Sequence, residues 1–270
     1  MPLTEFQRAI CRILAAKRVE MGDAYVAGGA ALNESLQAPR VSRDVDLFHD
    51  TREAVLVTSS ADRALLAEAG HEIRVLRDFP SFVEAEIHRG SESVILQWVQ
   101  DSAFRFFPLI HHPDFGLVLH PLDLAINKVL ALIGRIEIRD WVDVISCHTR
   151  LQPFGCLVWA AVGKDPGLNP QFILDQAARS THYSKDEYAL LDFAGAPPDP
   201  AALKSSWHTM LREGAEIVEL LPESHLGCCV LGADGSPFNG SPGELAALLQ
   251  RDEIHFHPGS IRGAWPIIKL

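Results

Sequence analysis

Residues 25–48 read YVAGGAALNESLQAPRVSRDVDLF and predict a short strand, a glycine turn, a short helix and a second strand. The apolar stretch 25–27 is typical of a strand. We expect the helix over 30–37 to end before Pro39, because the residue before a proline avoids helical backbone angles. Glycine at the mouth of a helix lets phosphate oxygens approach backbone N–H groups. The stretch therefore predicts a strand, turn and helix unit that can receive an anion.

An acidic pair follows the glycine turn. Asp44 and Asp46 stand one residue apart in the second strand. Strand side chains alternate between the two faces, so both carboxylates point the same way. They could hold Mg²⁺ beside a triphosphate, as phosphoryl transfer requires. A solvated edge strand explains the same spacing, but the preceding Gly28-Gly29 favours a metal site. The glycine pair does not belong to a P-loop, because no Gly-Lys-Ser/Thr follows it.

The rest of the chain predicts an α/β (α+β) protein in which a small mixed sheet is flanked by helices. Expected helices cover 4–20, 52–69, 121–134, 138–148, 170–180, 184–193 and 199–221, and Ser241-Pro242 opens a last one. Expected strands cover 72–78, 82–88, 93–99 and 226–231, and the tail 253–270 is expected to be irregular or to form short strands.

Prolines and glycines after residue 150 predict looser connections up to about residue 170. We therefore expect a first domain over 1–150 and a mainly helical accessory or acceptor domain over 151–270.

The charge balance bears on partners. The net charge is −11, and both 1–150 and 151–270 carry more acidic than basic residues. A broad electrostatic footprint for nucleic acid is therefore absent. A local basic patch remains possible from residues in or near the motifs: Arg40, Arg43, Lys128, Arg135 and Arg139.

Composition also bears on the compartment. The start of the chain lacks a basic segment followed by an apolar run, so we expect no secretory signal. No apolar stretch reaches the ~18 residues of a membrane helix, so we expect no membrane span. Five cysteines without zinc-like spacing predict reduced thiols in a cytoplasmic protein.

Two motif blocks resemble a known superfamily. GGAAL at 28–32 with RVSRDVDLF at 40–48 resembles the nucleotidyltransferase signature of the DNA polymerase beta superfamily. LHPLDLAINKVLAL at 119–132, continued by RDWVD at 139–143, is similar to the AbiEii/AbiGii-type nucleotidyltransferases, its toxin-like branch. The resemblance covers about 25–150, and 151–270 matches no family that we can name.

The resemblance implies metal-dependent transfer of a nucleoside monophosphate from an NTP to an acceptor, with Mg²⁺ or Mn²⁺. In some members the acceptor is a tRNA end, and these act as toxins beside an antitoxin. Carried over by position, the catalytic residues are Asp44, Asp46, Lys128 and Asp143, of which Asp44 and Asp46 ligate the metal. The nucleotide-binding group is Gly28, Gly29, Ser42, Arg40, Arg135 and Asp140.

One position departs from the superfamily pattern. Many members carry a third carboxylate on a later central strand, and Gln97 stands where we expect it. Glu84, Glu86 or Asp101 can substitute, but the strand register cannot be fixed from one sequence.

Each remaining motif has a plainer interpretation. Lys128 is by default a solvated helix lysine, although Lys128, Arg135 and Asp143 fall near one face of a continuous helix. Arg139 and Asp143 suit an ordinary i,i+4 ion pair. The histidines at 111–112 and at 255 and 257 are expected in loops or on the surface, since no third metal ligand accompanies them. Cys147 and His148 point apart on one helix and form no nucleophile pair.

Three functions therefore compete. The first is an AbiEii-like nucleotidyltransferase that acts on a tRNA, a protein or a small-molecule hydroxyl, with a possible antitoxin partner and no membrane. The second is a catalytically decayed module that holds a nucleotide without turnover, which Gln97 favours. The third is a glycosyltransferase that uses Asp44-x-Asp46 for a nucleotide-sugar, which the glycine pair and the Lys128 block disfavour.

Overall fold

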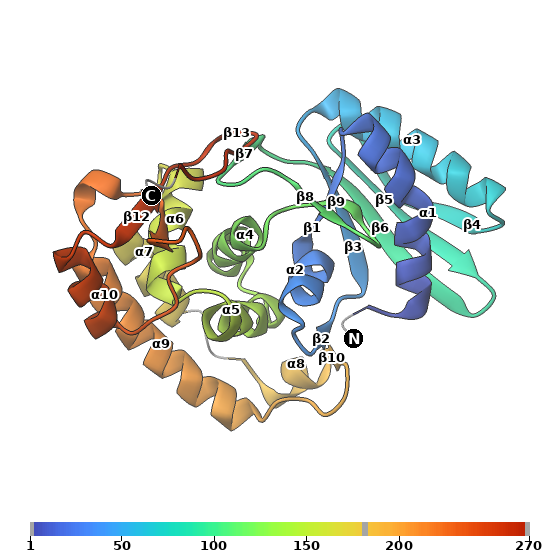
Figure 1. Ribbon diagram of the computed structural model, residues 1–270. Helices are drawn as coiled ribbons and strands as arrows, with labels where there is room; N and C mark the ends of the chain where they lie inside the picture. Colours follow the sequence, from blue (N-terminus) through green and yellow to red (C-terminus); the bar gives the residue numbers. More distant parts are fainter. Residues whose placement is uncertain (1–2, 180–182, 268–270) are drawn as a thin grey trace. The chain divides into compact units, whose positions relative to one another are not determined.

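The structure is a computed structural model that describes residues 3–179 and 183–267. It contains two compact units (Figure 1). The N-terminal unit comprises the described residues up to 103 together with 109–120, and the C-terminal unit comprises 104–108 and the described residues from 121 onward. The helices after residue 120 thus group with the C-terminal unit, whereas composition placed a boundary near 150. Residue 180 of one expected helix and 268–270 of the tail lie outside the described residues.

In the described part of the N-terminal unit, seven strands form one mixed sheet in the order β4-β5-β6-β3-β1-β9-β8. Its elements are α1 (Glu5–Met21), β1 (Tyr25–Ala27), α2 (Gly28–Leu36), β2 (Arg40–Val41), β3 (Asp44–His49), α3 (Arg52–Glu68), β4 (Glu72–Phe79), β5 (Phe82–Arg89), β6 (Glu92–Gln100), β8 (Ile110–His112) and β9 (Gly116–Val118). Strand β3 runs parallel to β6 and antiparallel to β1. The expected mixed sheet flanked by helices is confirmed, whereas β8 and β9 are too short for their pattern to predict them.

The two faces of the sheet differ in what covers them. Leu47 of β3 and its β6 partner Trp98 are fully buried, and the Trp98 indole N–H donates to Asp62 of α3 at 2.9 Å. This face therefore packs under α3. Because side chains alternate along a strand, Asp44 and Asp46 point to the opposite, half-buried face.

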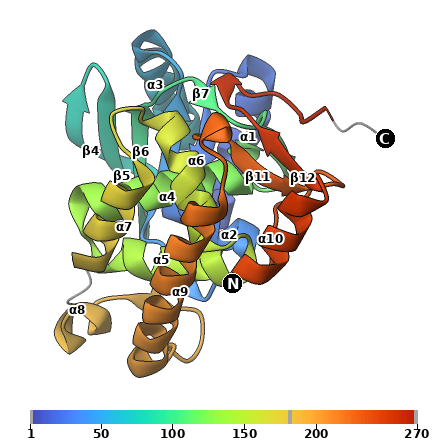
Figure 2. The same cartoon turned by 90° about the vertical axis from the view of Figure 1, so that its left-hand side faces the viewer.

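The C-terminal unit is mainly helical, as expected (Figure 2). Its elements are β7 (Phe104–Arg105), α4 (Pro121–Arg135), α5 (Ile138–Arg150), α6 (Phe154–Lys164), α7 (Pro170–Arg179), α8 (Lys185–Ala189), β10 (Asp192–Phe193), α9 (Pro200–Leu220), η1 (Glu223–His225), β11 (Cys229–Gly232), α10 (Pro242–Gln250), β12 (Ile254–His257) and β13 (Ser260–Ile261). Two short antiparallel pairs, β11 with β12 and β7 with β13, complete it. Among the described residues, no helix combines the length and apolar character that crossing a bilayer demands.

Helix α6 lies where the sequence predicted only looser connections, so that prediction was wrong. All residues over 154–162 are buried. A helix that is apolar all round has no polar stripe, so its 3.6-residue period is invisible in the sequence. Cys156 and Trp159 of α6 lie in a core cluster with Ile217, Val230 and other apolar residues.

Candidate functional site in the N-terminal unit

The turn between β1 and α2 places backbone against a carboxylate. Gly28 has a φ of +67°, and its neighbour Ala27 pairs with Asp46 across the β1–β3 ladder. A Cβ atom built on Gly28 would lie 1.6 Å from Oδ2 of Asp46. Glycine is therefore required twice here, for the left-handed backbone angle and for the space that the Asp46 carboxylate occupies.

The second glycine faces the other polar groups of the motif. A Cβ atom on Gly29 would lie 2.5 Å from Nη2 of Arg40 and 3.0 Å from Oγ of Ser42. The Ser42 hydroxyl donates a 2.8 Å hydrogen bond to Oδ1 of Asp44. We call this group the glycine corner. It brings together six residues that the sequence singled out: Gly28, Gly29, Arg40, Ser42, Asp44 and Asp46.

The glycine corner suits an anion beside a cation. It lies at the N-terminus of α2, where the helix dipole favours negative charge, and the N-cap residue Ala27 has no side-chain hydrogen bond to that end. The Arg40 side chain comes to the same place although only 4% of the residue is exposed. Arg40 therefore belongs to the corner itself and not to an exposed basic rim.

The two carboxylates fit a magnesium ion that shares its ligands with a phosphate. In proteins Mg²⁺ is commonly bound by one or two carboxylates, with substrate phosphates and water completing its octahedron. Asp44 and Asp46 supply such a pair on one face of β3. The described residues contain no group of three or more His, Cys, Asp or Glu side chains placed to hold a metal. Two carboxylates on one strand face are a donor set that Mg²⁺ can share with a phosphate.

The register shows what stands beside the acidic pair. Asp46 is opposite Gln97 of β6, and Gln97 is opposite Glu84 of β5. The Gln97 amide donates a 2.8 Å hydrogen bond to Oε1 of Glu84. Since neighbouring strands lie ~4.8 Å apart, Glu84 is about 10 Å from the Asp46 position and outside a shared metal shell. Glu84 also lies 3.5 Å from the Arg77 guanidinium.

The other two candidate substitutes for the third acid do not stand beside Asp46 in the strand register. Glu86 forms an ion pair with Arg74, and its Oε2 lies 3.0 Å from Nε2 of His88. The charge and hydrogen bonds of these partners keep the pKa of Glu86 below its usual value, with the Arg74 hydrogen bond as the largest cause. Asp101 follows the end of β6, where its backbone N–H donates to the His49 carbonyl.

A second predicted cluster lies in the C-terminal unit, and it is buried. Nζ of Lys128 on α4 lies 2.9 Å from Oδ1 of Asp140 and 3.2 Å from Oδ2 of Asp143 on α5. The Arg135 guanidinium donates two hydrogen bonds, of 2.7 and 2.9 Å, to the Asp140 carboxylate. Both carboxylates are fully buried and Lys128 is only 5% exposed. The interpretation of Lys128 as a solvated helix lysine is therefore wrong. We call Lys128, Arg135, Asp140 and Asp143 the Lys128 cluster.

The positive and negative charges of the Lys128 cluster are equal in number. Burial raises the pKa of Asp140, but the Arg135 hydrogen bond and the charges of Lys128 and Arg135 outweigh it and hold that pKa below its usual value. Asp140 is therefore ionised at neutral pH. Two carboxylates face two cations, which is the condition under which buried charge is tolerated.

The histidine and cysteine motifs have structural partners. Nδ1 of His112 accepts from the backbone N–H groups of Asp114 and Phe115. His257 is buried, contrary to the expected surface position, with Nε2 2.9 Å from two backbone carbonyl oxygens. Burial raises the pKa of the Cys147 thiol, which keeps it protonated and unreactive.

Comparison with solved structures places this fold. The chain superimposes on the nucleotidyltransferase toxin MenT4 from Mycobacterium tuberculosis with a TM-score of 0.54 and 17% identity, covering 81% of this chain and 83% of that one. The fold is nucleotidyltransferase-like. The protein JHP933 from Helicobacter pylori is also similar, with a TM-score of 0.48 and 13% identity over 80% of this chain and 95% of its own. No protein-family model matches the sequence, and no curated protein matches it.

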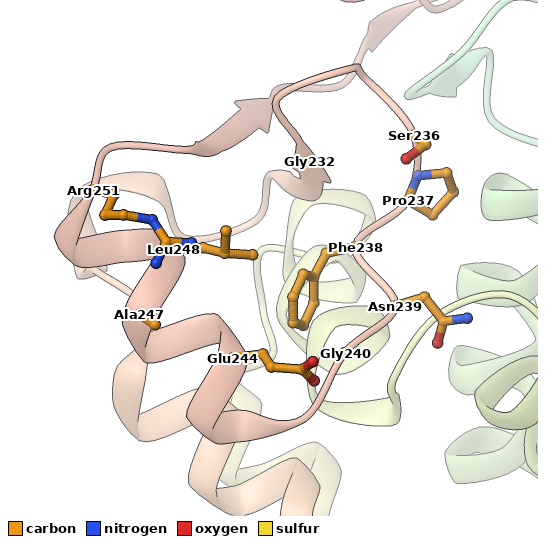
Figure 3. Close-up of a pocket in the computed structure, with 10 residues that line it drawn as sticks. All are labelled: Gly232, Ser236, Pro237, Phe238, Asn239, Gly240, Glu244, Ala247, Leu248 and Arg251. Carbon is orange, nitrogen blue, oxygen red and sulfur yellow. The ribbon is translucent and has the colours of Figure 1, made fainter.

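A separate cavity of about 480 Å³ lies in the C-terminal unit. Figure 3 shows the Phe238 ring between its own loop and α10, beside Leu248 and Glu244. The Glu244 carboxylate caps the N-terminus of α10, and Arg251 pairs with Glu253 at 3.0 Å. The charged groups of this cavity are therefore already used within the protein.

Proposed function

We propose that this protein is a metal-dependent nucleotidyltransferase that moves a nucleoside monophosphate from an NTP to an acceptor hydroxyl. The observation that carries the proposal is the position of the Asp46 carboxylate, which fills the space of a Gly28 side chain at the N-terminus of α2. Asp44 lies on the same face of β3 as Asp46. The nucleotidyltransferase-like fold supports it.

The residues of the glycine corner have separate tasks in this reaction. The N-terminus of α2 and Arg40 receive the triphosphate. The Ser42 hydroxyl holds the Asp44 carboxylate in place, and Gly28 leaves room for Asp46. A Mg²⁺ or Mn²⁺ ion held by Asp44 and Asp46 supplies neutralisation of the phosphate charge.

The chemical step is an in-line displacement. The acceptor hydroxyl oxygen forms a bond to the α-phosphorus of the NTP and loses its proton to solvent water. The bond from that phosphorus to the bridging oxygen breaks, and its electron pair leaves with pyrophosphate. The corner contributes mainly by positioning the triphosphate and by electrostatics.

The finer assignments are part of the proposal. We place the protein in the AbiEii-like branch, in the cytoplasm where NTPs are supplied, with a tRNA, a protein or a small-molecule hydroxyl as acceptor and an antitoxin as partner. MenT4 is named as a toxin, which supports this choice. The roles implied by resemblance for Lys128, Arg135, Asp140 and Asp143 stay predictions, and so does an acceptor role for 151–270.

Gln97 favours a second candidate function, a module that binds a nucleotide without turnover. An amide cannot replace an ionised carboxylate as a metal ligand of equal charge or as a base. Gln97 occupies the position opposite Asp46, and the nearest acid in that row, Glu84, is one strand further away.

A transfer assay with four NTPs, each radiolabelled at the α-phosphorus, tests the proposal against both alternatives. Wild type is incubated with Mg²⁺ and with RNA, protein and small-molecule acceptor pools. We expect incorporation that falls at least 100-fold in Asp46→Asn, whereas Asp78→Asn, which removes an exposed carboxylate of β4, keeps the wild-type rate. Bound label without incorporation supports the non-catalytic module, and transfer from a UDP-sugar but from no NTP supports a glycosyltransferase.

A further inference from the structure

A cavity of about 470 Å³ lies in the C-terminal unit, lined by residues of α5, α8 and α9 and by Tyr183 and Ser184. Figure 2 labels the three helices. This volume is within the range of ~300–1,000 Å³ in which small-molecule sites fall. Three aromatic residues line it, Trp141, Tyr183 and Tyr188, and two exposed lysines, Lys185 and Lys204, lie on the same lining. We call it the aromatic cavity.

The aromatic walls are held in place by packing. The Trp141 and Tyr183 ring centroids are 5.6 Å apart with the ring planes at 47°. Trp141 also packs against Trp207, at 6.2 Å. On the other side, the Tyr188 hydroxyl donates to the Pro198 carbonyl at 2.6 Å. Rings fixed in this way present π faces to a planar ligand without losing rotamer entropy on binding.

Two side chains that line the aromatic cavity each carry a buried polar atom that has no hydrogen-bond partner among the described residues. Trp141 is only 5% exposed, and its indole Nε1 makes no hydrogen bond with the described residues. The Tyr183 hydroxyl is also buried, and it too has no partner within 3–179 and 183–267. Burial, with the nearby carboxylates of Asp140, Glu187 and Glu137 as smaller causes, raises the pKa of Tyr183 to about 12, so its hydroxyl keeps a proton to donate. A buried donor left unpaired is costly, and a ligand with acceptor atoms would satisfy both.

The charges around the cavity admit an anion. Of the three carboxylates near Tyr183, Asp140 is neutralised by Lys128 and Arg135. Glu137 pairs with Arg139, and Glu187 caps the backbone of Ser184. Lys185 and Lys204 are left as the positive groups of the lining, and both are exposed enough to reach a phosphate at its edge.

We propose that the aromatic cavity binds one nucleotide, with its base between Trp141, Tyr183 and Tyr188 and its phosphate at Lys185 and Lys204. Ring nitrogens and carbonyl oxygens of a base accept from the Trp141 and Tyr183 donors, and stacking on aromatic rings is a general way to hold an unpaired base. The nucleotide comes either from a free mononucleotide or from a single-stranded RNA. The inference rests on the proposed function and adds a site that contains none of the glycine-corner residues.

Binding without metal separates the two sites. Wild type in EDTA is titrated with the four nucleoside monophosphates by calorimetry and with a fluorescein-labelled ten-nucleotide RNA by anisotropy. We expect Lys185→Ala with Lys204→Ala to weaken binding at least tenfold. Arg212→Ala with Arg251→Ala removes two positive charges outside the cavity and is expected to leave binding within twofold.

Two conservative variants probe the donors. Trp141→Phe and Tyr183→Phe keep a ring and remove one N–H or O–H. Each is expected to weaken binding about tenfold, equivalent to ~1.4 kcal/mol, with the unfolding midpoint in urea near that of wild type. If the variants bind the monophosphates more weakly but bind RNA as wild type does, the ligand is a free nucleotide. If only RNA binding is weakened, the ligand is a single-stranded RNA.

Equal binding by wild type, the lysine pair variant and Trp141→Phe overturns the inference, as does a wild type that binds neither probe. Metal-dependent transfer that persists in those variants leaves the proposed function standing. Conversely, nucleotidyl transfer that survives Asp46→Asn contradicts the proposed function. If the lysine pair variant still loses nucleotide binding in that case, the proposed nucleotide site in the aromatic cavity stands.

Discussion

A methyl group at Gly28 tests whether the glycine corner positions Asp46. In Gly28→Ala the new Cβ would start 1.6 Å from Oδ2 of Asp46, a distance that must grow to at least 3.0 Å. The carboxylate oxygen therefore has to move by about 1.4 Å or the turn has to open. A misplacement of ~1 Å in a catalytic site costs about 100-fold in rate. We expect kcat/KM for nucleotidyl transfer to fall at least 100-fold.

The loss of stability in Gly28→Ala can be compared with that of a matched glycine variant. Gly28 and Gly22 have nearly equal φ values, +67° and +68°, but a Cβ on Gly22 meets nothing within 4 Å. Gly22→Ala thus pays only the ~1–2 kcal/mol of a left-handed non-glycine residue. Since the Asp46 side chain can rotate away, we expect Gly28→Ala to cost about 1 kcal/mol more than Gly22→Ala.

Urea unfolding and the transfer assay are run on both alanine variants. Gly22→Ala is expected to lose stability and keep its activity, and Gly28→Ala to lose both. If Gly28→Ala transfers nucleotide within threefold of Gly22→Ala, the carboxylate has no fixed role at this corner and the reasoning is refuted.

Three further outcomes follow from buried and paired groups. Lys128→Met leaves the Asp140 carboxylate without one of its cations, and we expect about 3–5 kcal/mol less stability by urea unfolding; a loss under 1 kcal/mol argues against a buried pair. Burial lowers the pKa of His49 from 6.5 to about 4, so the unfolded chain binds the proton more tightly. Stability should then fall by about 3 kcal/mol as pH drops from 6.5 to 4, and His49→Asn should lack this part of the slope. Gln97→Glu replaces the 2.8 Å hydrogen bond to Glu84 with a second carboxylate. We expect the variant to be about 1 kcal/mol less stable than wild type at pH 8 and to regain wild-type stability near pH 4, as measured by thermal unfolding.

The N-terminal unit was largely predictable because its signals are local. Alternation in β3 put Asp44 and Asp46 on one face, and a glycine before a helix signalled the turn. The helix expected from residue 4 is α1, and it begins with a capping box formed by Thr4 and Gln7. What the sequence could not supply was register, because sliding β6 by one residue would turn Gln97 to the other face.

The C-terminal unit hid its organisation for physical reasons. Helix α6 has no polar side, so neither its period nor its ends stand out. The Lys128 cluster joins α4 to α5, and only tertiary packing shows that a helix lysine is buried. Likewise Trp141 and Tyr183 meet across about forty residues of sequence, and no local pattern marks the cavity that they line.

Titration with Mn²⁺ followed by electron paramagnetic resonance tests the central claim most directly, since it detects the ion at Asp44 and Asp46 without knowledge of the acceptor. Wild type and Asp78→Asn are expected to bind one ion per chain with equal affinity. The double variant Asp44→Asn with Asp46→Asn should bind at least tenfold more weakly while its circular dichroism is unchanged. Equal Mn²⁺ affinity in the folded double variant would contradict a divalent metal site at the glycine corner.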